Sequence, residues 1–186
     1  MSDLYRVFPF LPQAGPGEPG SALYVPPQGG GRLDNPDLYS VIYAGDREAG
    51  AVAESFGRFP EWTAAILEGS PTLAGSARAV ARLRLDDRAK LCDLDNPGQL
   101  AARGLRPSDV VSRDYTRTRE WARRIYHEGS WVGVRWWSYY DPRWSSCGIW
   151  ETGRLSLVDV RVLRLDDAAV VEAARTIARR IVTKTR

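Results

Sequence analysis

The sequence predicts a single α+β domain, in which a mixed β core is flanked by helices. Three observations point to this class. The 186 residues are 44% hydrophobic, which is enough to bury one sizeable core. The apolar patterns indicate both strands and helices, but without the regular βαβ alternation of a doubly wound sheet. No internal repeat and no linker divides residues 1–186 into smaller units.

The first elements are two strands separated by a long irregular arm. Residues 4–8 alternate as a strand does. Residues 9–36 hold 7 of the 12 prolines and 6 of the 17 glycines, among them the triple glycine 29–31, so we expect little regular structure there. An arm of this length inside a compact domain is usually functional or mobile. Residues 38–44, rich in tyrosine and β-branched residues, are predicted as a buried strand.

The middle of the chain predicts one helix and two strands. Asp46 is expected to cap a helix that continues to about Phe56. Residues 77–85 alternate small or apolar residues with arginine, which predicts a strand. Residues 90–94 are predicted as another short strand.

The C-terminal half predicts two helices and three strands. A helix over residues 107–128 is expected to end at Gly129. Strands are predicted over residues 132–138, 147–150 and 155–165. The first helix has an apolar face made of Trp121, Ala122, Ile125 and Tyr126. The last helix is expected to start at Asp167, with an apolar stripe made of Val170, Val171, Ala174, Ile177, Ala178 and Ile181.

Cysteine and histidine usage excludes several kinds of site. Cys92 and Cys147 lie 55 positions apart without Cys-x-x-Cys spacing, which gives neither a disulfide framework nor a zinc site and fits a reducing compartment. His127 is the single histidine, so a His-rich metal centre is excluded. We expect His127 to be an ordinary helix-end residue, and we expect no metal or other cofactor.

The basic residues are almost all arginine, with 24 arginines against Lys90 and Lys184. The net charge is only +3, which is weak evidence for nucleic-acid binding but allows an arginine that binds phosphate. The N-terminus lacks a basic region followed by an apolar stretch, and no apolar run approaches the roughly 18 residues of a membrane helix. We expect a cytoplasmic protein without membrane contact.

Four polar residues in separate elements are the candidates for function, because the familiar nucleotide-binding and metalloprotease motifs are absent. Arg32 directly follows the triple glycine, where a ligand can approach the backbone closely. Tyr43 ends a predicted strand, Glu54 lies on the helix after it, and Ser138 ends the strand over residues 132–138. Taken one at a time, each is more often a structural residue than a functional one.

The order of these residues resembles the RES-domain family, which is named after an Arg, a Glu and a Ser in this order. The matching segments cover about residues 4–165 and are Leu4-Tyr5-Arg6-Val7, Gly31-Arg32, Tyr43-Ala44, Ala51-x-x-Glu54, Thr118-Arg119-Glu120-Trp121-Ala122 and Gly133-Val134-Arg135-Trp136-Trp137-Ser138. The chain departs at Leu33-Asp34, where members often carry an aromatic residue and Asn, and at Trp136-Trp137, where they often carry Tyr-Pro. These departures concern the shape of the pocket more than its chemistry.

The resemblance implies the toxin of a type II toxin–antitoxin system, with a fold similar to that of ADP-ribosyltransferase toxins. It implies that NAD⁺ is the substrate and is cleaved between nicotinamide and ribose, by hydrolysis or with phosphate as co-substrate; ADP-ribosyl transfer to a protein stays open. The implied partner is an antitoxin with a DNA-binding helix-turn-helix that blocks the pocket, so DNA would be contacted only through it. Self-association is left open.

The four candidate residues suit this chemistry. Breaking the bond develops oxocarbenium charge on the ribose, which a carboxylate stabilises, and Glu54 is the candidate for that role. Arg32 would bind a phosphate of NAD⁺ through two parallel hydrogen bonds. Tyr43 would offer nicotinamide a flat face and a hydroxyl. Ser138 would hydrogen-bond the ribose or a phosphate and not act as a nucleophile, because no base is assigned to it.

A non-catalytic module that binds nucleic acid or protein is the competing interpretation. Its surface would be the aromatic cluster Trp131, Trp136, Trp137, Tyr139, Tyr140 and Trp144. Such a cluster can stack bases, but it is also typical of a core or of the wall of a pocket for a flat ligand. Arg47, Arg58 and Arg135 are secondary candidates for a phosphate contact.

Overall fold

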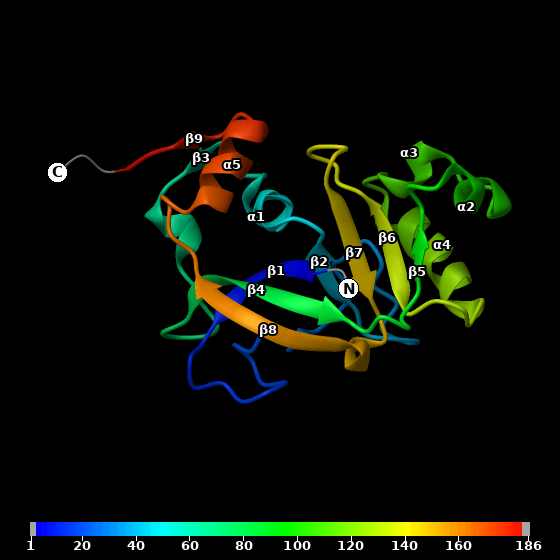
Figure 1. The fold of residues 1–186 in the computed structure, drawn as a ribbon, viewed down its shortest axis with the longest axis horizontal. Coiled ribbons are helices and arrows are strands. Elements are labelled where there is room, and N and C mark those ends of the chain that lie inside the picture. The colour runs from blue at the N-terminus through cyan, green and yellow to red at the C-terminus, as the bar shows by residue number, and fades with distance from the viewer. Residues whose placement is uncertain (1–2, 184–186) are drawn as a thin grey trace.

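The computed structural model describes residues 3–183 of the chain and has the predicted α+β class. A mixed sheet runs in the order β5-β6-β7-β2-β1-β4-β8 (Figure 1). Its strands are β1 (Asp3–Phe10), β2 (Ile42–Gly45), β4 (Ala77–Leu85), β5 (Leu91–Asp93), β6 (Gly133–Trp137), β7 (Ser145–Ile149) and β8 (Leu155–Val162). Neighbouring strands are antiparallel except β5 and β6, which are parallel.

The sheet is divided into two halves at the boundary between β1 and β2. These two strands share the single residue pair Tyr5–Gly45, whereas β1 pairs with β4 along its whole length. In Figure 1, β1, β4 and β8 run in a clearly different direction from β6 and β7. Where β1 and β2 part, residues 5–7 and 43–45 border a gap between the two halves, and the candidate site lies there.

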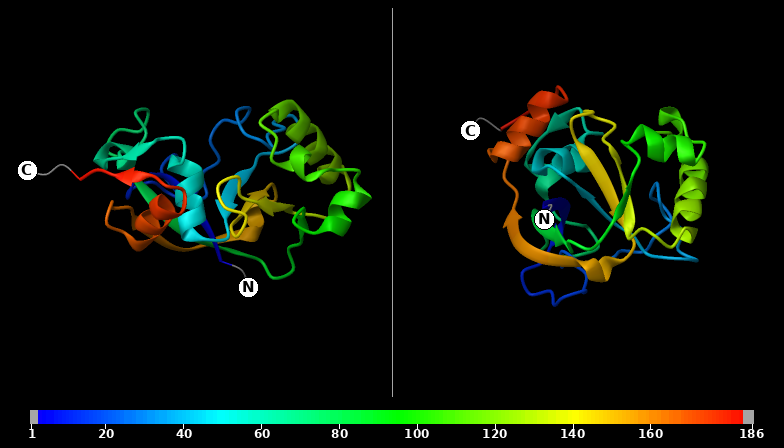
Figure 2. Two further views of the ribbon diagram at one scale, coloured as in Figure 1. Left: turned by 90° about the horizontal axis from the view of Figure 1, so that it is seen from above. Right: turned by 45° about the vertical axis from the view of Figure 1, so that its right-hand side comes forward.

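Helices cover the two halves separately (Figures 1 and 2). Helices α1 (Glu48–Phe56) and α5 (Ala168–Thr176) pack on the β1–β4–β8 half through a buried cluster that includes Val52, Val80 and Val170. Helices α2 (Pro97–Ala102), α3 (Pro107–Val110) and α4 (Tyr115–His127) pack on the β5–β6 half. Within residues 3–183, no helix combines the length and the apolar character needed to cross a bilayer.

The remaining elements are short and lie at the edges. Strands β3 (Glu61–Trp62) and β9 (Arg180–Ile181) form a separate parallel pair beside α5. Two 3₁₀ turns, η1 (Ala64–Leu67) and η2 (Thr152–Arg154), follow β3 and precede β8.

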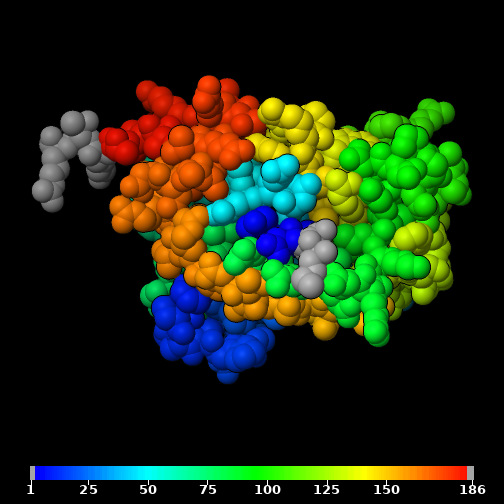
Figure 3. Space-filling model, viewed as in Figure 1, coloured from blue at the N-terminus to red at the C-terminus, as the bar shows by residue number. Residues whose placement is uncertain are grey.

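The arm predicted over residues 9–36 is confirmed as irregular from Leu11 onward, since neither helix nor strand occurs between Phe10 and Ile42, but residues 9 and 10 belong to β1. Its first part forms a bulge beneath the sheet, blue in Figure 3. The arm is nevertheless packed, because Ala22 is buried against Leu4 and Phe8 of β1. From there it turns back toward β2 and brings the triple glycine to the gap between the two halves.

The helix predicted over residues 107–128 is wrong in one respect, because it is two helices with a break between Val110 and Tyr115. The break has a local cause in Asp114. Its carboxylate accepts the backbone N–H groups of Thr116 and Arg117 and so starts a new helix. The second helix keeps the predicted apolar face, with Trp121 and Ile125 buried, and Gly129 follows its end with a positive φ of 65°.

The expected cap at Asp46 is also wrong. The N-cap of α1 is Arg47, which makes no side-chain bond to the helix, and Asp46 instead accepts the backbone N–H of Ser145 at 2.8 Å. The adjoining strand is shorter than residues 38–44, since β2 begins only at Ile42. The reason is a turn in which Leu38 N and Tyr39 N both donate to Asn35 O.

The last helix ends at Thr176, earlier than the predicted stripe to Ile181. Ala178 adopts a positive φ of 53°, and the backbone N–H of Arg179 donates to Ala174 O at 2.7 Å, a Schellman closure. Val171, expected in the apolar stripe, is exposed. The buried face of α5 is Ala169, Val170, Ala173 and Ala174.

Candidate active site

Glu54 and Ser138 meet across the gap although 84 positions separate them in the sequence. Glu54 projects from the last turn of α1, and Ser138 directly follows β6. The Ser138 hydroxyl donates to Glu54 Oε1 at 2.6 Å and accepts the backbone N–H of Tyr140 at 3.1 Å. Both roles of this hydroxyl are therefore fixed, and Ser138 orients the carboxylate.

A second serine supports the same carboxylate oxygen. Ser146 of β7 donates from Oγ to Glu54 Oε1 at 3.3 Å. Ser138 and Ser146 are both buried, while the Glu54 side chain itself is exposed to the cavity. The two serines therefore hold the Glu54 carboxylate, and the same carboxylate faces the cavity. This is the arrangement needed to oppose a positive charge on a ligand.

Arg32 is held by the break between α3 and α4. Its Nη1 donates to the carbonyl oxygens of Val110 at 2.6 Å and Ser112 at 2.7 Å, so it satisfies acceptors that the broken helix leaves open. The guanidinium lies over the ring of Tyr115, 5.5 Å from its centroid. Burial lowers the pKa of Arg32, while the ionisable Tyr115, Glu54 and Tyr43 beside it act in the opposite direction. Because Nη1 carries both bonds, the edge formed by Nε and Nη2 is left for a ligand.

Tyr43 uses its hydroxyl to fix the loop that carries Arg32. The hydroxyl donates to Asp34 Oδ1 at 2.7 Å and accepts the backbone N–H of Leu33 at 2.8 Å. Burial and the Asp34 carboxylate both raise the pKa of Tyr43, so the phenol stays protonated at neutral pH. The expected use of this hydroxyl to orient nicotinamide is therefore replaced by a structural one, and only the ring is free to face a ligand.

Asp34 holds the loop of residues 29–34 together through hydrogen bonds to the loop's own backbone. Its Oδ2 accepts the backbone N–H groups of Gly29 and Gly31, both at 2.7 Å. Burial alone would raise the pKa of Asp34, but these bonds, the Tyr43 hydroxyl and the charge of Arg119 hold it below its usual value. Gly31 has to be glycine here, because a Cβ would overlap the Tyr43 hydroxyl and the Asp34 carboxylate. Asp34, where the chain departs from the residue common in the family, thus accepts three hydrogen bonds.

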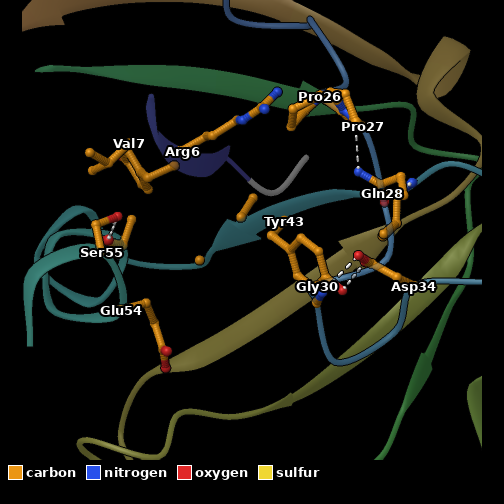
Figure 4. A pocket seen from close by; sticks show the side chains of 16 residues that line it. Arg6, Val7, Pro26, Pro27, Gln28, Gly30, Asp34, Tyr43, Glu54 and Ser55 are labelled. Carbon is orange, nitrogen blue, oxygen red and sulfur yellow. Dashed lines mark hydrogen bonds between the residues drawn. The ribbon is translucent and has the colours of Figure 1, made fainter. Parts of the chain in front are cut away.

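Two neighbouring cavities share this site. The first, of about 350 Å³, is called the arm-side cavity and is bordered by Arg6, Pro26 and Gln28 together with Tyr43 and Glu54 (Figure 4). The second, of about 260 Å³, is called the helix-side cavity and is bordered by Arg32, Tyr115, Trp136, Tyr139 and Ser146. Both cavities include Gly31, Tyr43, Ala44 and Glu54 in their walls.

The structure brings all four sequence candidates to one place, since Arg32, Tyr43 and Glu54 line the helix-side cavity and Ser138 binds Glu54. The secondary arginines lie elsewhere. Arg135 is paired with Asp93 at 2.9 Å and lines neither cavity, and neither do Arg47 and Arg58. His127 is the last residue of α4 and is also outside both cavities, as expected.

Most side chains of the aromatic cluster are buried or half-buried against the core. Trp136 and Trp144 are buried, and Tyr139 alone in the cluster is largely exposed, at 57%. Tyr139 and the exposed Tyr115 both border the helix-side cavity. Cys92 and Cys147 are free thiols and both are buried, and burial raises the pKa of the Cys92 thiol to about 11.

Sequence reasoning did not identify Ser146 or Tyr115 as site residues; it noted Asp34 only as a departure from the family pattern and Tyr139 only as a member of the aromatic cluster. Ser146 and Asp34 act through Glu54 and Tyr43, contacts that only the folded chain creates. Asp34 had one signal, its place two residues after Arg32 in the resembling segment. Within residues 3–183, no group of three or more His, Cys, Asp or Glu side chains is arranged to hold a metal ion.

The arrangement suits the stabilisation of positive charge next to an anionic ligand. Glu54 presents an oriented carboxylate, and Arg32 presents a guanidinium edge in the same cavity. The Ser138 hydroxyl donates to a carboxylate and not to a histidine, so Ser138 is not part of a serine triad. The site fits reactions in which a cation develops on the substrate.

Comparison with known proteins gives a family match and a structural match. The family model described as RES domain matches residues 4–166. A chain of the crystal structure of the M. tuberculosis MbcT-MbcA toxin-antitoxin complex superposes with a TM-score of 0.58 at 19% sequence identity. The match covers 95% of this chain and 89% of that chain, and at this identity it shows the fold alone. No curated protein matches the sequence.

Proposed function

The chain belongs to the RES domain family, and from this premise we propose that it is the toxin of a toxin–antitoxin pair that cleaves NAD⁺ between nicotinamide and ribose. One observation carries the proposal. The carboxylate of Glu54, held by the Ser138 hydroxyl at 2.6 Å, stands where the arm-side and helix-side cavities meet.

The reaction needs an oriented negative charge more than it needs an acid. When the bond between C1′ and the pyridinium nitrogen breaks, its electron pair passes to the nitrogen, and nicotinamide leaves as a neutral molecule. The ribose keeps an oxocarbenium charge, which a nearby carboxylate stabilises. Glu54 supplies that carboxylate, and Ser138 and Ser146 keep it in place without giving up a proton to the leaving group.

Arg32 holds the other end of the substrate in this proposal. Its Nε and Nη2 edge would take a phosphate oxygen pair of NAD⁺, while Nη1 stays on Val110 O and Ser112 O. The rings of Tyr43 and Tyr115 border the same cavity and would contact a flat base. Water or phosphate then adds to C1′ and loses a proton, giving ADP-ribose or its 1-phosphate; no cofactor takes part.

The antitoxin is the proposed partner. The MbcT-MbcA match is a toxin-antitoxin complex, and an uninhibited NAD⁺-consuming enzyme would starve its own cell. Exposed aromatic side chains anchor protein interfaces, and Tyr139 is such a residue at the rim of the helix-side cavity. A helix-turn-helix antitoxin seated there would block the cavity.

The test is to incubate the purified chain with NAD⁺, with and without phosphate, and to identify the products by chromatography. We expect nicotinamide release, and the second product then distinguishes ADP-ribose from its 1-phosphate. Release only after a protein acceptor is added would assign the chain to ADP-ribosyl transfer. No release at micromolar concentrations of folded, antitoxin-free protein would refute the proposal, and salt-dependent nucleic-acid binding in its place would favour a binding module.

A further inference from the structure

The outer edge of β8 is a long strand edge with which no other strand pairs within residues 3–183. β8 (Leu155–Val162) ends the seven-stranded sheet on one side, whereas the opposite end is β5, which has only three residues. In Figure 3, the orange segment of β8 lies on the surface of the molecule. The unpaired backbone groups of such an edge can pair with another chain, so proteins usually shorten the edge, cover it or place charges on it.

The backbone groups of Val160 face this outer edge. Just after β8, Leu163 N donates to Arg78 O of β4 at 2.9 Å. In an antiparallel pair, residues that bond the neighbouring strand alternate with residues that face away from it. Arg161 and Asp159 therefore bond β4 in the register of this sheet, and Val160 between them turns its N–H and C=O groups outward.

The two faces of β8 differ in character. Val160 and Val162 lie opposite buried alanines of β4, on the face of the core, where Val160 is half-buried and Val162 is 45% exposed. The other face is charged, and Arg161 there forms ion pairs with Glu48 of α1 and with the N-cap residue of α5. Within the described part of the chain, no basic side chain forms an ion pair with Asp159, which is exposed on the same face.

The sequence of residues 158–162, Val-Asp-Val-Arg-Val, is complementary to itself when two copies run in opposite directions. If Val160 lies opposite Val160 of a second copy, Asp159 faces Arg161 and Val158 faces Val162, and two-fold symmetry gives each of these pairs twice. A shift by two residues would place Asp159 against Asp159, or Arg161 against Arg161, and like charges directly opposite each other disfavour pairing. Charge complementarity therefore selects one register for a pair of copies.

We propose that the chain associates with a second copy of itself through β8, with the two-fold axis at Val160, so that two seven-stranded sheets join into one. The outward N–H and C=O groups of Val160 would bond the same groups of the second copy. A bulge between Leu157 and Asp159 limits the regular ladder to the residues from Val158 onward, so we expect a weak association. β8 borders neither the arm-side nor the helix-side cavity, and the inference therefore goes beyond the proposed function and does not rest on it.

The experiment measures the association of the full chain by sedimentation velocity over a range of concentrations. We expect a monomer–dimer equilibrium for the wild type, with Kd in the micromolar range because the interface is narrow. Asp159→Arg and Arg161→Asp each place like charges opposite one another twice, so each should raise Kd by about tenfold or more. Glu172→Arg is the control, since Glu172 is an exposed carboxylate of α5 and not of β8, and it should leave Kd unchanged.

Mixing the two β8 variants gives the sharpest readout. In an equimolar mixture, the charges of Asp159→Arg are opposite to those of Arg161→Asp at both positions, so a dimer with one copy of each variant should form and be visible by native mass spectrometry. A wild-type chain that stays monomeric up to about 1 mM overturns the inference. A dimer that neither variant weakens, or a mixture of the two folded variants that stays monomeric, overturns it as well.

A further variant keeps the test decisive. Arg161→Asp also removes the ion pair to Glu48, so circular dichroism and urea unfolding check that it folds. If it does not fold, Val160→Pro replaces it, because proline removes an N–H that β4 does not use and should abolish the dimer while the chain's own sheet stays intact. A dimer that Val160→Pro leaves unchanged overturns the inference. None of these readouts involves NAD⁺, so a chain that dimerises in this way but releases no nicotinamide would refute the proposed function and leave this inference standing.

Discussion

Replacing Glu54 with Gln removes one negative charge from the junction of the two cavities and leaves the shape of the side chain unchanged. In the wild-type chain, Oε1 accepts hydrogen bonds from Ser138 at 2.6 Å and Ser146 at 3.3 Å. The carbonyl oxygen of Gln can accept both, so the variant should fold and bind NAD⁺ almost as before. It would no longer oppose the oxocarbenium charge that appears only during bond cleavage.

The expected loss therefore falls on kcat and not on KM. Removing one oriented electrostatic stabiliser costs about 10² to 10³ in rate, or roughly 2.7–4 kcal/mol of transition-state stabilisation. Steady-state nicotinamide release measures kcat and KM, and circular dichroism with urea unfolding checks the fold. Glu172→Gln is the matched control, since Glu172 is an exposed carboxylate of α5 outside both cavities. A folded Glu54→Gln variant with kcat near that of the wild type would refute the assignment of Glu54.

Three further changes test the surroundings of Glu54. Arg32→Lys should raise KM by about tenfold or more, because the three N–H donors of an ammonium cannot bond Val110 O and Ser112 O and also two phosphate oxygens; an unchanged KM would remove Arg32 from substrate binding. Asp34→Ala should lower the free energy of unfolding by about 1–3 kcal/mol at pH 7, because buried donors lose their acceptor. Folding lowers the pKa of Asp34, so the stabilisation by its carboxylate is present above the unfolded value near 3.9 and is lost as pH falls through the folded value. Urea unfolding should show that the difference in free energy of unfolding between wild type and variant shrinks below about pH 3.9. A difference that stays constant with pH would contradict this. A non-cleavable NAD⁺ analogue at saturation should slow hydrogen exchange across residues 26–36, since Pro26, Gln28 and Gly31 border the arm-side cavity; unchanged exchange would mean that the arm does not contact the substrate.

The sequence predicts the strands of this fold well where the pattern has a period of two residues. Residues 77–85 alternate arginine with small or apolar residues, and β4 has the same bounds. The four site residues also follow from the sequence, because their order and neighbours carry the resemblance. The parts that could not be predicted depend on contacts between distant segments. The break that holds Arg32 looks from the sequence like the interior of one helix, and its carbonyls lie 78 and 80 positions from Arg32.

The role of Tyr43 shows a second limit of the same kind. A tyrosine at the end of a strand beside a predicted pocket suggests a ligand contact for its hydroxyl. Only the folded chain shows that Asp34 and the Leu33 N–H occupy that hydroxyl. The identity of Asp34 fits this use, since a carboxylate accepts three hydrogen bonds there without donating any.

The two halves of the sheet are joined along a narrow seam, because β1 and β2 share the single residue pair Tyr5–Gly45. Glu54 belongs to α1, which packs on the half formed by β1, β4 and β8, while Ser138 and Ser146 belong to the half of β6 and β7, so the hydrogen bonds that hold the Glu54 carboxylate cross the seam. Widening the seam breaks one ladder pair and leaves every other strand pairing intact. The chain should therefore lose its activity at a lower urea concentration than the one that unfolds either half of the sheet. The loss of catalysis would then show that the two halves have separated before spectroscopy detects unfolding.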